Sequence, residues 1–214
     1  MEEILIINKP KNWTSNDVVQ KVKGILKVKK VGHGGTLDPL ATGVLVLGIN
    51  NGTKLLSKFL VDEKEYIAKI EFGFNTTTYD LEGDVINRSD KIIEIDNIKN
   101  ILEYYLNNHE QYPPIYSAIK KNGKPLYDYA RKNIDVAIEP RTMKVIKYEI
   151  LDFKDNILEI RMTVPKGFYI RSFSNDIGIK LDTYATLINL IRTRSGDFKI
   201  EDAVEIESLI NENL

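Results

Sequence analysis

The sequence predicts one α+β domain over residues 1–214, and three observations lead to this fold class. Stretches with helical and strand-like apolar spacing follow one another without the regular β-α-β alternation of a parallel α/β sheet. The chain has 214 residues, of which 43% are hydrophobic and 29% are charged, so it can bury one core and has a globular composition. It contains no internal repeat, low-complexity tract or linker that would separate two domains.

The first helix is predicted to begin near Thr14. Thr14 is a favourable N-cap residue, and Asp17, three residues later, lies near the positive end of the helix dipole. Apolar residues then recur at helical spacing, at Val18, Val19, Val22, Ile25 and Leu26.

A glycine-rich loop follows this helix and leads into an apolar strand at residues 43–49. Its three glycines, Gly32, Gly34 and Gly35, allow the backbone to turn sharply and a ligand to approach closely. The spacing matches neither a Walker loop nor the dinucleotide-binding pattern. The loop instead presents a carboxylate, Asp38, directly before a proline. The simpler interpretation of such an isolated Asp–Pro pair is an Asx-turn.

The later elements are predicted from the same periodicities. Residues 65–74 alternate between apolar and polar and predict a half-buried strand. The other periodic stretches predict a helix near 98–106, strands around 143–150 and 157–164, a helix near 170–180, and a strand near 187–193.

Two segments differ from these periodic stretches. Residues 112–141 mix Pro, Gly, Lys and Tyr without a long apolar period. They predict a protruding, partner-facing insertion with little apolar anchorage of its own. The tail at about 199–214 is acidic, and we expect it to be short and helical.

The composition excludes several classes of protein and site. Zero cysteines exclude disulfides, thiolate catalysis and Cys-based zinc sites, and the presence of only two histidines argues against a His-rich metal site. No apolar run approaches the ~20 residues that cross a bilayer, and the acidic Met1-Glu2-Glu3 start is unlike a signal peptide. We therefore expect a cytoplasmic protein without a metal or a membrane partner.

Charge is distributed unevenly, although the formal net charge is only −1. Residues 9–34 carry seven Lys and one Asp, whereas residues 62–110 carry five basic and twelve acidic side chains. Basic residues also exceed acidic ones in 112–149 and in 161–194. Clustered Lys and Arg indicate binding to a polyphosphate such as RNA, although an uneven solvated surface explains the charge alone equally well.

Two further residues are candidates with simple structural alternatives. Arg171 lies near the start of a predicted helix, where a cation opposes the helix dipole and requires a compensating anion. Asp176 could supply that anion locally. Tyr66, on the apolar face of its predicted strand, is by default a core aromatic residue.

Six motifs resemble those of the TruB family of tRNA pseudouridine synthases, in the same order along the chain. Residues 30–45, KVGHGGTLDPLATGVL, resemble the family's catalytic motif. The other similar stretches are KPKNWTS at 9–15, KEYIAKIEFGFNTTTYDLEG at 64–83, PPIYSAIKKNGKPLYDYAR at 113–131, and GFYIRS at 167–172 with LIRTRSG at 190–196. Together they span nearly the whole chain.

The resemblance implies a fold and a reaction. The expected fold is the pseudouridine synthase fold, a mixed and mainly antiparallel sheet split by a catalytic cleft and flanked by helices. The expected reaction is the cofactor-free isomerisation of uridine to pseudouridine in the T-loop of tRNA, at position 55. The implied partner is the T-arm stem-loop of tRNA, and a monomer is the default state.

The resemblance also implies roles for individual residues. Asp38 is the catalytic carboxylate, Arg171 pairs with it, and Tyr66 stacks on the flipped base. Residues that contact the substrate are expected at His33, Tyr169, Leu190, Lys9 and Asp80, and, in the insertion at about 112–141, at Lys120, Lys124 and Arg131.

Three residues and the length of the chain depart from the family pattern. Gly34 stands where many bacterial members have Thr, and Asn12 where the opening motif usually has Gly. Ile191 replaces the first Arg of the usual Leu-Arg-Arg, which would weaken a phosphate contact. The chain also ends soon after the expected catalytic core, so we expect a short form without the C-terminal PUA-type domain.

Three other functions are compatible with parts of the sequence. A catalytically idle tRNA-folding chaperone would have a damaged nucleophile, yet Asp38, Tyr66 and Arg171 are all present. A hydrolase using Asp38 would need a nearby metal-binding acid, and the loop offers no second carboxylate within ten residues. The same isomerisation on a different RNA is the closest alternative.

Overall fold

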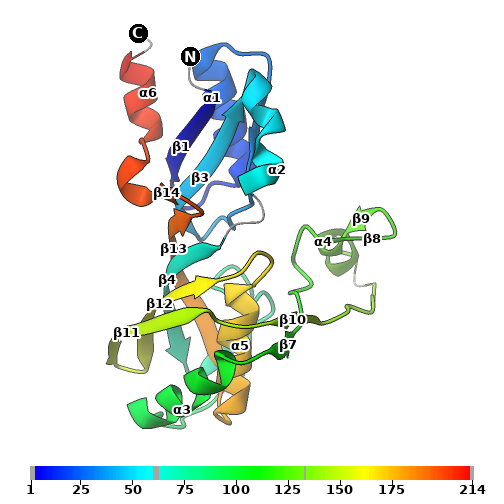
Figure 1. Cartoon of the computed structure of the whole chain (residues 1–214). Helices are drawn as coiled ribbons and strands as arrows, with labels where there is room; N and C mark the ends of the chain where they lie inside the picture. Colours follow the sequence, from blue (N-terminus) through cyan, green and yellow to red (C-terminus); the bar gives the residue numbers. More distant parts are fainter. Residues whose placement is uncertain (1–2, 60–62, 133, 213–214) are drawn as a thin grey trace. The chain divides into compact units, whose positions relative to one another are not determined.

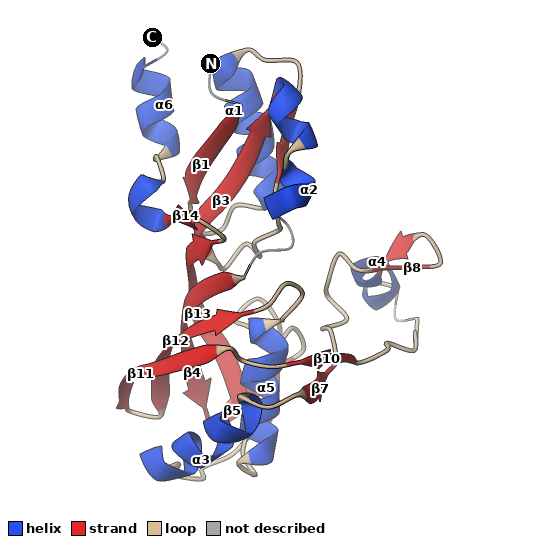
Figure 2. Cartoon of the chain, viewed as in Figure 1, coloured by secondary structure: helices blue, strands red, loops and turns tan. Residues whose placement is uncertain are grey.

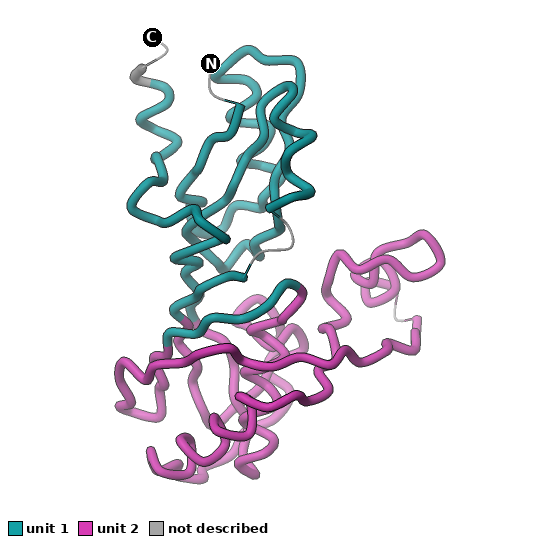
Figure 3. The backbone as a smooth tube through the Cα atoms, viewed as in Figure 1, with its two compact units in different colours: residues 1–67, 161–166, 189–214 teal, residues 68–160, 167–188 magenta. Residues whose placement is uncertain are grey.

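The computed structural model describes residues 3–59, 63–132 and 134–212 (Figure 1). The chain divides into two compact units (Figure 3). Unit 1 comprises residues 1–67, 161–166 and 189–214, and unit 2 comprises residues 68–160 and 167–188. The single catalytic domain expected from the sequence stays a prediction, and the last two residues of its tail lie outside the described part of the chain.

Unit 1 is built on two long antiparallel strands, β1 and β3, which pair from Ile4–Gly48 to Lys9–Gly43. β2 is antiparallel to β3, and the C-terminal part of β13 pairs with β3 in parallel. The elements of unit 1 are β1 (Ile4–Lys9), α1 (Ser15–Leu26), β2 (Val31–His33), β3 (Thr42–Ile49), a 3-10 turn (Asn50–Lys54), α2 (Leu56–Phe59), β14 (Phe198–Lys199), a 3-10 turn (Ile200–Asp202) and α6 (Ile206–Glu212), with the ends of β4, β12 and β13.

The predicted start of the first helix is confirmed. Thr14 caps α1 by accepting a hydrogen bond from the Asp17 N–H, and the Asp17 carboxylate accepts from the Thr14 N–H at 2.8 Å. Val18 and Val22 on this helix are fully buried. The core next to β3 is formed by Val44, Val46 and Leu56, and is extended by Ile4, Ile6, Phe59, Phe198 and Ile200.

Unit 2 contains a sheet with the strand order β13–β4–β12–β11. Its elements are β5 (Phe74–Thr76), β6 (Val85–Arg88), α3 (Ile95–Tyr105), β7 (His109–Gln111), β8 (Lys120–Lys121), β9 (Lys124–Pro125), α4 (Leu126–Ala130), β10 (Arg141–Met143), β11 (Lys147–Lys154) and α5 (Ile170–Lys180). Three strands have residues in both units: β4 (Lys64–Phe72), β12 (Ile157–Val164) and β13 (Ala185–Ser195). Figure 2 shows α3 and α5 close together in this unit.

A cluster of ring side chains holds α3, β7 and α5 together in unit 2. The Tyr105 ring lies 4.9 Å from that of Phe173 and 4.7 Å from that of His109, both in edge-to-face geometry. Phe168 adds a further contact to Phe173 at 5.9 Å. His109 is therefore part of the core of this unit.

The structure differs from the sequence-based expectation at two places. The strand expected over 65–74 ends at Phe72, because Gly73 has a φ of +110° and Phe74 begins β5. The insertion at 112–141 was expected to have little apolar anchorage, and that is wrong. It contains the β8–β9 hairpin and α4, with Leu126 only 1% exposed. Within the described residues, no helix has the length and apolarity needed to cross a membrane.

Candidate active site

Asp38 lies in unit 1, in the loop between β2 and β3. The Gly34 N–H donates to the Val46 carbonyl at 2.7 Å, which fastens the start of this loop to β3. The Asp38 carbonyl accepts from the Ala41 N–H at 3.0 Å, so residues 38–41 form a turn. Asp38 is partly exposed and can meet a substrate.

Lys9 has its ammonium directed at the same loop. The residue is fully buried, and Nζ donates to the carbonyls of Pro10 at 2.8 Å, Trp13 at 2.6 Å and Pro39 at 3.3 Å. A buried ammonium needs such acceptors to replace its water. Lys9 therefore positions the residue after Asp38, and its expected contact with substrate stays a prediction.

His33 lies at the end of β2, where the loop begins. Burial lowers the pKa of His33, and the positive charge of Arg192 lowers it further. The imidazole is therefore neutral at pH 7. A neutral ring can fill a space next to a base without introducing charge.

Tyr66 and Leu190 lie on neighbouring strands of unit 1. Tyr66 on β4 is half-buried, and Leu190 on β13 is 5% exposed. The Thr193 hydroxyl donates to the Glu65 carboxylate at 2.8 Å, which joins the two strands beside them. Both side chains thus belong to rigid elements, as residues that line a binding pocket require.

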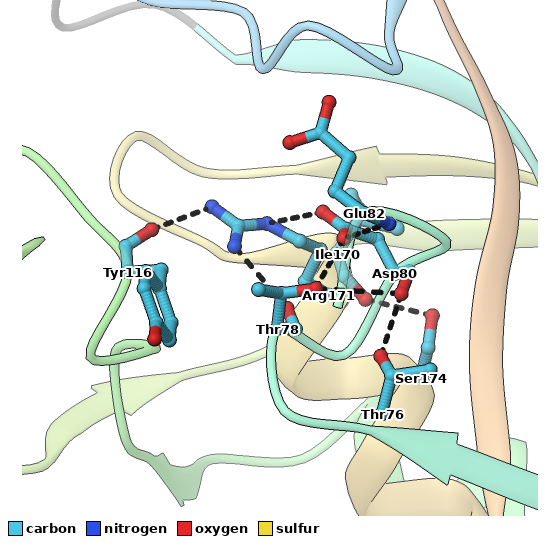
Figure 4. Close-up of polar contacts among 8 residues, drawn as sticks. All are labelled: Thr76, Thr78, Asp80, Glu82, Tyr116, Ile170, Arg171 and Ser174. Carbon is cyan, nitrogen blue, oxygen red and sulfur yellow. Dashed lines mark hydrogen bonds and ion pairs between the residues drawn. The ribbon is translucent and has the colours of Figure 1, made fainter. Parts of the chain in front are cut away.

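Arg171 lies in the first turn of α5 in unit 2 and is 6% exposed. Its Nε lies 3.6 Å from Oδ2 of Asp80, and its two terminal nitrogens donate to the carbonyls of Thr78 at 3.2 Å and Tyr116 at 3.0 Å (Figure 4). Asp80 thus supplies an anion that a cation at this end of a helix requires. Arg171 is a buried, oriented group and not a surface helix residue.

Asp80 is itself held in place from several sides and is 1% exposed. Its Oδ1 accepts from the Thr78 hydroxyl and from the Glu82 N–H at 3.0 Å, and its carbonyl accepts from the Thr76 hydroxyl at 2.6 Å. The sequence predicted Asp80 as a substrate contact. The structure directs its carboxylate at Arg171, so a contact with RNA stays a prediction.

The loop that carries Asp80 depends on residues for which the sequence suggested no role. A Cβ atom at Gly83 would come within 2.5 Å of the Thr78 hydroxyl oxygen and 2.6 Å of that of Thr77, so only glycine fits there. The sequence also suggested no role for Gln111, which holds Tyr169 and not the Asp80 loop. Its side-chain amide accepts from the Tyr169 N–H at 2.8 Å and donates to the Tyr169 carbonyl at 3.1 Å.

These two contacts position Tyr169, the N-cap residue of α5, two places before Arg171. The aromatic side chain itself is half-buried. The only local signal for Gln111 in the sequence is a polar residue two places before Pro113-Pro114, which does not reveal its distant partner.

The basic residues of the insertion, Lys120, Lys124 and Arg131, are all exposed. The first two lie on the β8–β9 hairpin, and the guanidinium of Arg131 lies 5.4 Å from the ring centroid of Tyr127. Lys121 differs from them, because its ammonium donates to the Ala137 carbonyl. The hairpin thus exposes Lys120 and Lys124, whereas Lys121 is engaged in a contact within the insertion.

Each unit therefore assembles its own part of the expected site. Unit 1 holds Asp38, His33, Tyr66, Lys9 and Leu190. Unit 2 holds Arg171 with Asp80, Tyr169 and the basic hairpin. The pairing of Asp38 with Arg171 stays a prediction. Among the described residues, no three His, Cys, Asp or Glu side chains are grouped so that they could hold a metal ion.

Comparison with known proteins decides the family. Residues 23–170, which include the Asp38 loop and the Asp80 loop, match the family described as "TruB family pseudouridylate synthase (N terminal domain)". The chain belongs to the TruB family. The family expected from the sequence motifs is thereby confirmed, and with it the class of enzyme, an isomerase.

Curated TruB-family relatives match over nearly the whole chain. A protein of Ureaplasma urealyticum serovar 10 named tRNA pseudouridine synthase B is 53% identical over 211 residues, which cover 97% of this chain and 92% of the relative. A protein of the same name from Malacoplasma penetrans is 41% identical over 215 residues, which cover 99% and 92%.

Solved structures confirm the pseudouridine synthase fold expected for a TruB-family chain. A chain in the crystal structure of a Cbf5–Nop10–Gar1 complex superposes with a TM-score of 0.77 at 30% identity. The match covers 97% of this chain and 53% of that one. This chain thus spans about half the length of the solved structure that it matches.

Proposed function

We propose that this TruB-family enzyme isomerises uridine to pseudouridine in the T-loop of tRNA, at position 55, with Asp38 as the catalytic carboxylate. The observation that carries the proposal is the Asp38 loop, a partly exposed carboxylate on a backbone fixed by Lys9 and β3. The name of the Ureaplasma relative supports tRNA as the substrate.

The proposed reaction is an isomerisation that needs a well-placed carboxylate and no cofactor. The C–N glycosidic bond of uridine breaks, the base turns, and C5 of the base forms a C–C bond to the same ribose carbon. C5 loses a proton and N1 gains one, so nothing is oxidised and no atom is added. Asp38 supplies the group that acts on the ribose or the base as the bond breaks.

Arg171 is proposed to serve Asp38 as a fixed positive charge. A guanidinium close to a carboxylate in a desolvated cleft keeps that carboxylate ionised. The contacts of Arg171 to Asp80, Thr78 and Tyr116 support this role, because they set the plane of the guanidinium before substrate arrives. Preorganised charge of this kind costs no rearrangement during the reaction.

The remaining residues are proposed to receive a flipped uridine. A base in a loop can leave its stack at a cost of a few kcal/mol and stack on an aromatic ring. Tyr66 is proposed for that stacking, and Tyr169 and Leu190 for lining the pocket. His33, which is neutral at pH 7, would fill the space that the base vacates.

Asp38→Asn tests the catalytic assignment, because it removes the reactive carboxylate and changes little volume. We expect no pseudouridine in a T-arm stem-loop incubated with the pure variant, and a dissociation constant for that RNA within a few-fold of wild type. Asp90→Asn is the matched control, because Asp90 is exposed and lies outside the site. Turnover by a homogeneous Asp38→Asn sample contradicts the role of Asp38.

The substrate is tested separately by mapping pseudouridine in whole tRNA and in mRNA transcripts incubated with wild-type protein. Modification at the T-loop uridine supports the proposal. Modification confined to other RNA shows the same isomerisation on another substrate. Accelerated tRNA folding without any pseudouridine indicates the chaperone.

A further inference from the structure

The backbone of the Asp38 loop has a hydrogen-bond donor at every carbonyl from Gly35 to Pro39. The Asp38 carbonyl accepts from the local Ala41 N–H at 3.0 Å. The other donors belong to residues distant in sequence: Arg192 for Gly35 and Thr36, Ser15 for Leu37, and Lys9 with the Asn12 N–H for Pro39. A loop with this many glycines is otherwise free to adopt many conformations.

Arg192 supplies the greatest number of these bonds and is 2% exposed. Its Nε donates to the Val44 carbonyl at 2.7 Å, and its terminal nitrogens donate to Gly35 at 3.2 Å and Thr36 at 3.5 Å. The planar guanidinium thereby joins strand β3 to the loop that precedes it. Because the guanidinium of Arg192 points inward and donates to these carbonyls, it is not placed to bind a phosphate.

The backbone of Arg192 is pressed against β3 at the same point. Gly43 pairs with Arg192 in the parallel ladder, and a Cβ atom at Gly43 would lie 2.2 Å from the Arg192 carbonyl oxygen. Gly43 also has a φ of +99°, which side chains rarely adopt. This close approach sets the distance from which the guanidinium reaches the loop.

Ser15, the first residue of α1, holds the loop from a different element. Its hydroxyl accepts from the Leu37 N–H at 2.9 Å and donates to the Leu37 carbonyl at 3.2 Å. The residue is 3% exposed. One hydroxyl thus satisfies both backbone groups of the residue directly before Asp38.

We propose that Arg192 and Ser15 are positioning residues that fix the backbone of residues 35–37 and so aim the Asp38 carboxylate at the substrate. This inference rests on the proposed function, in which Asp38 is the catalytic carboxylate. Neither residue touches the substrate. A misplacement of about 1 Å at a reacting group can reduce a rate on the order of 100-fold, so the loss of either residue acts on the chemical step.

Arg192→Lys and Ser15→Ala test the two contacts separately. Lysine keeps the charge, but its single nitrogen cannot replace the three coplanar nitrogens that donate to the Val44, Gly35 and Thr36 carbonyls. We expect each variant to slow the single-turnover rate at saturating T-arm RNA by about 10- to 100-fold, with the dissociation constant within about three-fold of wild type. Arg88→Lys, an exposed arginine on β6, is the matched control and should react like wild type.

Hydrogen exchange provides a measurement that does not need activity. In both variants the Leu37 and Ala41 amides should exchange faster, while the amides of β1 and β3 keep their protection. Uniformly faster exchange contradicts a positioning role and shows general destabilisation. A wild-type rate at saturation with weaker RNA binding also overturns the proposal, and assigns Arg192 to a phosphate contact.

Because hydrogen exchange is measured beside the single-turnover rate, a failure of this inference can be distinguished from a failure of the proposed function. If Arg192→Lys does not fold, Ser15→Ala decides, because it removes only one oxygen. If wild-type protein forms no pseudouridine, the proposed function fails, while the exchange of the Leu37 amide still shows whether these side chains fix the loop. Unchanged exchange in Ser15→Ala overturns the inference.

Discussion

At Arg171, three contacts depend on the planar shape of a guanidinium. Lysine keeps the positive charge, but its single nitrogen cannot reproduce the planar spacing of the three nitrogens that meet Asp80, Thr78 and Tyr116. Arg171→Lys should therefore reduce the single-turnover rate on the order of 100-fold. Rates at saturating T-arm RNA, compared with Arg88→Lys, check this. A lysine variant as fast as wild type shows that charge alone suffices.

One departure from the family pattern, Asn12, is explained by its own backbone conformation. Asn12, where the opening motif usually has Gly, adopts a φ of 66°. Asparagine tolerates this left-handed conformation better than most other non-glycine residues. Its N–H donates to the Pro39 carbonyl at 2.8 Å, so the replacement leaves the contact to the Asp38 loop in place.

At the scale of elements, the hairpin and helix of the insertion form a small folded body. The Leu126 side chain is buried, the Tyr129 hydroxyl donates to the Lys121 carbonyl at 2.9 Å, and the Leu126 N–H donates to the Ile119 carbonyl at 2.8 Å. The exposed cations are therefore held on a structured support. Lys121 belongs to that support through its contact to Ala137.

The variant that tests RNA binding by this insertion combines Lys120→Ala, Lys124→Ala and Arg131→Ala. The logarithm of the RNA association constant falls linearly with the logarithm of the salt concentration, and each lost phosphate contact should reduce the steepness of that line by roughly 0.7 to 0.9. The triple variant should therefore have a slope about two units less steep than wild type. The chemical step at saturating RNA should change much less, because none of the three residues is assigned to the reacting groups.

The control for this experiment replaces two exposed lysines elsewhere in unit 2, Lys99 and Lys154, with alanine. Titration of RNA at several salt concentrations, with single-turnover rates for each protein, makes the comparison. An equal slope in the triple variant and the control indicates that the three cations form a solvated surface.

At the scale of the whole molecule, Asp176 makes stability depend on pH. Burial raises the pKa of Asp176 to about 6 from 3.8, against the opposite effects of a hydrogen bond to Asn175 and the charge of Lys180. Tyr79 and Tyr105 also face this carboxylate. The folded protein therefore holds the proton more tightly than the unfolded chain, so the contribution of Asp176 is greatest below pH 3.8 and is lost as the pH rises through 6.

Asp176→Asn mimics the protonated carboxyl and should stabilise the protein at pH 7. The shift corresponds to at most about 3 kcal/mol in the free energy of unfolding. At pH 4 the variant and wild type should be nearly equally stable. Denaturant unfolding at both pH values, with Asp90→Asn as the control, measures the difference. A gain that is equal at the two pH values contradicts the titration of Asp176.

Much of the molecule could be predicted from local features of the sequence. The capping of α1 by Thr14 involves residues three apart, and the alternation along β4 reports which side chains face the core. The order of six motifs indicated the family, and the Asp38 loop was singled out from the sequence. These features are readable because each depends on residues near one another in the chain.

Only the tertiary structure revealed which side chains fix the expected site residues. Arg192 lies 157 residues from Gly35, and Arg171 lies 93 from Thr78, so no local spacing connects them. The sequence suggested that the motif containing Arg192 contacts phosphate, and it gave Gln111 no role. The periodicity of apolar residues in the sequence predicts which side chains are buried. Which backbone carbonyl it meets there depends on how strands from distant parts of the chain pack.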